Sequence, residues 1–150
     1  MKWVWFILIG LATLVAVVAF IGMQLPRNHM ASRTLRVRRP PQDVWPVVTQ
    51  TMAASSVPTD IVENDPPRRL VSRVKDTETM FGGTWTVILT PVEERSAATS
   101  STLTITEDGW VANPIFRFVS RFVVGHHATM DGMLKSVAKQ LGEEPALFGE

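Results

Sequence analysis

Three histidines and one carboxylate are the residues best suited by type to hold a metal ion. Asp131 follows His127 by four positions, the spacing at which two side chains of a helix can share a ligand. His126 is adjacent to His127, and neighbouring helical residues point about 100° apart, so the two cannot face one ion. His29 follows the apolar N-terminal segment, and a zinc site needs three or four ligands. We therefore expect no metal and no other cofactor, and local hydrogen-bonding or helix-end roles for these histidines.

Two pairs of carboxylates have the residue type needed for general acid–base catalysis. Glu93 and Glu94 lie in a polar run, and Glu107 and Asp108 open the motif EDGW. Such catalysis requires a carboxylate in an apolar pocket, whereas both pairs fall in predicted turns. The sequence also has no nucleophile elbow and no phosphate-binding glycine loop. We expect solvated carboxylates and assign no catalytic residue.

Arg117 and Arg121 are four positions apart, so they share one stripe of a helix. Such a pair is more often a solvated face than a binding site. An anionic head group is the alternative, because basic residues near a membrane gain about 1 kcal/mol each beside acidic lipids.

Composition excludes several classes of protein. The 150 residues contain no cysteine, which removes disulfides, thiolate catalysis and cysteine-based metal sites. The formal net charge is +1 and the basic residues form no long run, so we expect no nucleic-acid partner. The length suits one domain once the apolar N-terminal segment is subtracted.

That N-terminal segment predicts a membrane anchor. Residues Trp3 to Met23 carry no charged side chain, and as a helix they span about 30 Å, the hydrocarbon thickness of a bilayer. The alternative is a cleaved signal peptide, but its apolar region is about 7 to 15 residues and precedes a small-x-small cleavage site, which FIGMQLPRNH lacks. We expect an uncleaved single-pass anchor over residues 1–25, in contact with the membrane through residues 3–23, and a linker over residues 26–30.

The charges flanking the anchor predict its orientation. Only Lys2 and the amino terminus precede it, whereas five arginines follow it within about 20 residues, the range in which flanking charge counts: Arg27, Arg33, Arg36, Arg38 and Arg39. The positive-inside rule then places the following domain in the cytoplasm.

The remaining chain alternates as an antiparallel sheet with two helical segments. SRTLRVR has the period of a half-buried strand, PPQDVWPVVTQTMA predicts a short amphipathic helix, and DPP separates two further strands. TWTVILT and TSSTLTIT predict two more strands, followed by a turn at EDGW. Asn113 and Pro114 then begin a helix to Leu141, which Gly125 interrupts, with Ile115, Phe118, Val119 and Phe122 on an apolar stripe.

This order of elements resembles the START-like superfamily, also called SRPBCC or polyketide cyclase/dehydrase-like. The segments that carry the resemblance are RTLRVRRPPQDVWPVVT, FGGTWTVILTP and ITEDGWVANPIFRFVSRFVVGHHATMDGMLKSVAKQLGE, the last being similar to small bacterial members with a membrane anchor. The resemblance implies an α+β helix-grip fold over residues 31–143, in which a curved antiparallel sheet wraps around a long C-terminal helix, with a short tail over 144–150. The segment from Gln50 to Arg69 is shorter than in many members.

The resemblance also implies a cavity between sheet and helix for a lipid-like or other hydrophobic molecule. We expect six side chains to line it: Trp85, Val87, Trp110, Phe118, Phe122 and Met133. The leading hypothesis is a membrane-anchored ligand-binding module. The alternatives are an enzyme of the cyclase or dehydratase type, and a membrane-tethered interaction module without a small ligand.

Overall fold

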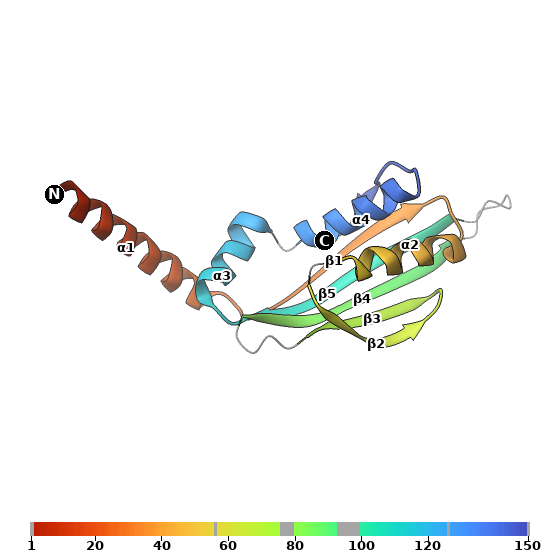
Figure 1. Ribbon diagram of the computed structural model, residues 1–150, viewed down its shortest axis with the longest axis horizontal. Coiled ribbons are helices and arrows are strands. Elements are labelled where there is room, and N and C mark those ends of the chain that lie inside the picture. Colours follow the sequence, from red (N-terminus) through yellow and green to blue (C-terminus); the bar gives the residue numbers. More distant parts are fainter. Residues whose placement is uncertain (1, 56, 76–79, 93–99, 126, 150) are drawn as a thin grey trace.

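The computed structural model describes residues 2–55, 57–75, 80–92, 100–125 and 127–149. It is an α+β structure built on a curved, antiparallel, six-stranded sheet (Figure 1), with strand order β2-β3-β4-β5-β1-β6. The strands are β1 (Asn28–Val37), β2 (Thr59–Asp65), β3 (Arg69–Val74), β4 (Phe81–Val92), β5 (Ser100–Val111) and β6 (Leu147–Phe148). The helical elements are α1 (Lys2–Gln24), α2 (Pro41–Ala53), α3 (Pro114–Val119), the π-helical turn η1 (Ser120–Val124) and α4 (Ala128–Gln140).

The predicted strands are confirmed, and several are longer than their patterns indicated. The DPP motif separates β2 from β3, which pair from Asp65 and Arg69 outward. β1 begins at Asn28, inside the predicted linker, and β6 pairs with β1 from within the predicted tail. β5 continues through the EDGW motif to Val111, so the turn predicted there is wrong. Its register with β4 and β1 satisfies the backbone groups of this motif in a continuous ladder.

The core lies between one face of the sheet and the helices α2 and α4. Because side chains of a strand alternate between faces, Leu35 of β1, Val87 of β4 and Ile105 of β5 all point to this inner face and are fully buried. The helices cover them with apolar faces at helical spacing: Val44, Trp45 and Val48 from α2, and Met130, Leu134, Val137 and Ala138 from α4.

The C-terminal helix predicted from Pro114 to Leu141, with an interruption at Gly125, consists of the three elements α3, η1 and α4, and the interruption is confirmed. Asn113 caps α3 as expected, since its Oδ1 accepts from the Ile115 amide at 2.9 Å. The π-helical η1 then adds a residue per turn, and Gly125 breaks the chain with a φ of 79°. The apolar stripe of α3 is therefore out of phase with that of α4. Only α4 lies on the sheet, whereas α3 packs against α1 (Figure 1).

The end of α1 is held closely against the start of α3. A Cβ added at Gly22 would lie 1.9 Å from the Pro114 carbonyl oxygen, so only glycine permits this approach. The buried Arg117 side chain donates to the carbonyl oxygens of Gly22 at 3.2 Å and Leu25 at 3.1 Å, and the Gly22 oxygen also accepts from the Leu25 amide at 3.3 Å. By length and composition α1 fits a membrane span or a signal sequence.

Candidate functional site

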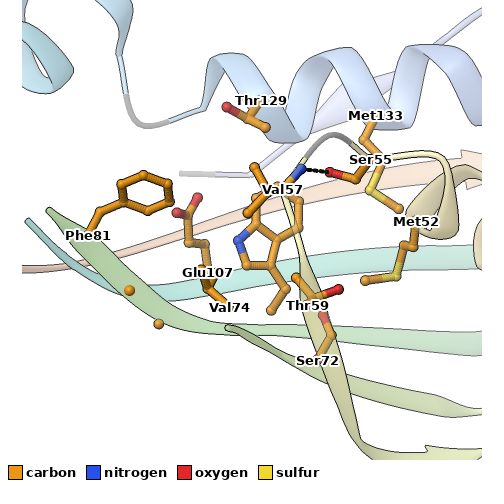
Figure 2. A pocket seen from close by; sticks show the side chains of 13 residues that line it. Met52, Ser55, Val57, Thr59, Ser72, Val74, Phe81, Glu107, Thr129 and Met133 are labelled. Atoms are coloured by element: carbon orange, nitrogen blue, oxygen red, sulfur yellow. Dashed lines mark hydrogen bonds between the residues drawn. The ribbon is translucent and has the colours of Figure 1, made fainter. Parts of the chain in front are cut away.

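A pocket of about 310 Å³ opens between the inner face of the sheet, the end of α2 and the start of α4 (Figure 2). Its wall is mostly apolar, and a few polar groups interrupt it. The lining residues are Met52, Ser55, Val57, Thr59, Ser72, Val74, Phe81, Gly82, Gly83, Trp85, Glu107, Thr129 and Met133. An apolar concavity with a small number of polar groups is the usual form of a small-molecule site.

Glu107 is the charged group of this pocket, although the sequence placed it in a solvated turn. It lies on β5 two residues after the buried Ile105, so the alternation of the strand directs its side chain to the inner face. Figure 2 shows the carboxylate rising from the sheet beside Phe81. The Glu107 Oε1 lies 3.5 Å from His29 Nε2 of β1, and both side chains are about one-fifth exposed. The neighbouring Asp108 points to the other face and is exposed.

Ser72 adds a second polar group to the wall. The residue is 2% exposed, and its Oγ has no hydrogen-bond partner among the described residues. A buried hydroxyl without a partner costs about 1 to 3 kcal/mol, so this oxygen is a ready contact for a polar atom of a ligand. Ser55 differs from Ser72, because its Oγ already accepts from the Val57 amide at 3.3 Å. Nothing in the sequence distinguishes Ser72 from other serines of the strands.

Of the six residues predicted to line the cavity, the structure places two in the pocket wall. Trp85 of β4 and Met133 of α4 line it from opposite sides. Val87 is fully buried one step further along β4, where it belongs to the packed core.

Trp110, Phe118 and Phe122 lie elsewhere. Trp110 is on the outer face of β5, where its ring covers Gly82 so closely that a Cβ there would lie 2.8 Å from it. Phe118 and Phe122 belong to α3 and η1, and their ring centroids are 5.0 Å apart. They are absent from the wall because the break at Gly125 separates their helix from α4.

Apart from His29 and Glu107, the residues considered for metal binding and catalysis are dispersed. Asp131 pairs with Arg33 of β1, with 3.0 Å between Oδ1 and Nε, and so joins α4 to the sheet. His127 precedes α4, and its Nδ1 has no hydrogen-bond partner within the described ranges. In those ranges no group of three or more histidine, aspartate and glutamate residues is placed to hold a metal ion. His126, Glu93 and Glu94 lie outside the described residues.

The two arginines considered together have different environments. Arg117 is buried, and its guanidinium is used on backbone carbonyl oxygens, including that of Ala112 at 2.7 Å. Arg121 is exposed on η1 and lines a smaller hollow with Arg27, just after α1.

Comparison with known proteins shows similarity at the level of fold. No family model matches the chain, and no curated protein matches it. A conserved protein from Geobacillus kaustophilus superposes with a TM-score of 0.56 at 12% identity, over 81% of this chain and 100% of that one. A protein from Thermobifida fusca superposes with a TM-score of 0.52 at 15% identity, over 75% of this chain and 93% of that one.

The structural neighbours also include an aromatase/cyclase from a Streptomyces species. Its TM-score is 0.39 at 14% identity, over 75% of this chain and 93% of that one. A TM-score at this level supports no conclusion about this chain. The two better matches, at identities this low, bear on the fold alone.

Proposed function

We propose that this protein is a membrane-anchored module with a START-like fold that binds a hydrophobic small molecule, such as a lipid, in the pocket between sheet and helices. The observation that carries the proposal is the mostly apolar pocket whose wall contains the Glu107 carboxylate and the Ser72 Oγ, which has no partner in the part of the chain that the structure describes. Its volume of about 310 Å³ is near the lower end of the range for small-molecule sites. The ligand is therefore a compact apolar molecule, or one apolar part of a larger one, with a hydrogen-bonding group.

The position of the pocket supports a link between the ligand and the membrane. One end of the pocket is formed by Phe81 to Gly83 of β4, which pair with Gly109 to Val111 of β5. The Val111 amide in turn donates to the Arg27 carbonyl oxygen at 2.9 Å, three residues after α1 ends. A bilayer around α1 would lie next to this end of the pocket, so an apolar ligand could pass between them without crossing much water.

The arginines after α1 support a cytoplasmic position for the domain, as the positive-inside rule requires. Because the chain has no cysteine, the position can be tested with Arg36→Cys in intact cells. We expect a membrane-impermeant maleimide to label this exposed residue only after the cells are opened. Labelling of intact cells would place the domain on the other side.

Native mass spectrometry of the full chain, extracted in detergent and offered a lipid extract, tests the ligand. We expect a bound mass with the wild-type protein and with Lys135→Trp, an exposed change on α4 away from the pocket. Thr129→Trp, on the same helix but at the pocket wall, should abolish it by filling the space. A wild-type protein that carries no mass would contradict the proposal and favour an interaction module without a small ligand.

The carboxylate in the wall favours an enzyme as the second candidate function. Glu107 beside His29 has the residue types of an acid–base pair, and it faces an apolar space. If the protein is an enzyme, Glu107→Gln should retain a molecule that the wild type converts. After incubation with the extract, the mass of the bound molecule is compared between the wild type and Glu107→Gln. The same mass in both proteins favours a binding module, and a different mass favours an enzyme.

A further inference from the structure

The segment formed by α3 and η1 exposes an apolar surface that the described part of the chain does not cover. Phe122 is 58% exposed and Val123 is 71% exposed, and Val124, Ile115 and Phe116 are also exposed. Single apolar side chains at a surface are ordinary, but these five lie on one segment of eleven residues, since α3 has 6 and η1 has 5. An exposed apolar surface of this kind marks a site that contacts another protein or a membrane.

The place of this segment is fixed by its attachment to α1. Pro114 lies against Gly22, and Arg117 holds the carbonyl oxygens of Gly22 and Leu25, so α3 begins at the C-terminal end of α1. Figure 1 shows α3 between α1 and α4, diverging from α1. If α1 spans a bilayer, α3 and η1 therefore lie at the level of its surface.

The charges nearby match that location. Arg27 and Arg121 are exposed and line a hollow of about 210 Å³ together with Asn28 and Ser120. Neither arginine is paired with a carboxylate within the described residues. Exposed arginines beside apolar side chains are the arrangement of a helix that lies in the interface of an anionic membrane, with the guanidinium groups at the lipid phosphates.

We propose that α3 and η1 form a second membrane contact, in which Phe116, Phe122, Val123 and Val124 enter the bilayer interface beside α1 and Arg27 and Arg121 bind lipid phosphates. This inference rests on the proposed membrane span, and it adds a docked orientation of the domain. The docked segment is joined through Gly125 to α4, whose first turn contributes Thr129 to the pocket. Docking would thus hold the pocket at the membrane surface.

Spin labels at single cysteines test the contact in the full chain, reconstituted in nanodiscs of phosphatidylcholine and phosphatidylglycerol. The label at Val123→Cys should be more accessible to oxygen than to a water-soluble nickel complex. Thr90→Cys, on an exposed position of β4, should show the reverse. Gly10→Cys, where a side chain meets nothing within 4 Å, reports on α1 itself.

The outcomes separate the contact from the anchor. The proposal is supported if the labels at position 10 and position 123 are both more accessible to oxygen than to the nickel complex, as expected in lipid. If the label at position 10 is more accessible to oxygen but the label at position 123 is more accessible to nickel, the second contact is overturned and the anchor remains supported. Water exposure at position 10 overturns the anchor and the contact that rests on it. A double change of Arg27 and Arg121 to glutamine should make position 123 more accessible to nickel, and no change there would overturn the role of the arginines.

Discussion

Arg117 of α3 and Gly22 of α1 are in contact although they are 95 positions apart: the guanidinium donates to the Gly22 carbonyl oxygen at 3.2 Å. The same guanidinium donates to Leu25 and Ala112, so one side chain joins the end of α1, the end of β5 and the start of α3. The geometry of this junction sets the direction in which α1 leaves the domain.

Replacing Arg117 should loosen the junction. Arg117→Met retains the apolar stem but removes three hydrogen bonds to carbonyl oxygens, each worth about 1.5 to 3 kcal/mol because the donor is charged. Spin labels at Gly10→Cys and Thr90→Cys should give a narrow distance distribution in the parent and a broad one in the variant. Arg68→Met, which changes an exposed arginine between β2 and β3, is the control and should leave the distribution narrow. Equal widths in all three proteins would show that other contacts fix α1.

Two glycines of α1 offer a matched pair of substitutions. Gly22→Ala places a Cβ 1.9 Å from the Pro114 carbonyl oxygen, so α1 and α3 must separate, whereas Gly10→Ala meets nothing within 4 Å. Alanine favours a helix over glycine by about 1 kcal/mol, which makes Gly10→Ala neutral or stabilising. Thermal melts of the full chain in detergent should show a lower melting temperature only for Gly22→Ala. The distance distribution between the labels should likewise broaden only for that variant. Identical behaviour would contradict the close approach.

The sheet could be predicted from the sequence because its signals are local. Period-two alternation marks the strands, and a Pro-rich turn such as DPP marks a hairpin, so neither requires knowledge of distant contacts. The turn at EDGW was wrong because Gly109, a residue typical of turns, is used here to admit the His29 ring, which a Cβ would meet at 2.8 Å. That partner lies on another strand, and no local pattern indicates it.

The candidate site was harder to predict for the same reason. Trp85 and Met133 follow from the apolar faces of single elements, and both line the pocket. The sequence does not indicate Glu107 because its position in the pocket wall depends on β5 continuing past residue 106. Phe118 and Phe122 are predicted on the inner wall because the interruption expected at Gly125 does not by itself indicate how the two helical parts are arranged. In the structure, η1 and the break at Gly125 separate these residues from α4.

Ser72 should affect stability and binding in opposite directions. Its Oγ is buried without a partner among the described residues, so Ser72→Ala removes an unsatisfied group and should be neutral or stabilising by up to about 3 kcal/mol. The same change removes a contact for the proposed ligand, and a lost hydrogen bond corresponds to roughly a 2- to 10-fold weaker affinity. Thermal melts and native mass spectrometry of the full chain measure the two effects. A large destabilisation would mean that the hydroxyl already serves the fold.

Phe122 and Leu134 should differ in what they contribute to folding, although both lie in the C-terminal third of the chain. Leu134 of α4 is fully buried against the sheet, so Leu134→Ala should cost about 2 to 5 kcal/mol through lost contacts and a cavity. Phe122 is 58% exposed and touches the Phe118 ring, so Phe122→Ala should cost at most about 1.5 kcal/mol, the upper value of an aromatic pair. Denaturant or thermal unfolding of the full chain in detergent, followed by tryptophan fluorescence, compares them. A loss at Phe122 as large as that at Leu134 would place Phe122 in the core, whereas a small loss leaves its side chain available for the proposed membrane contact.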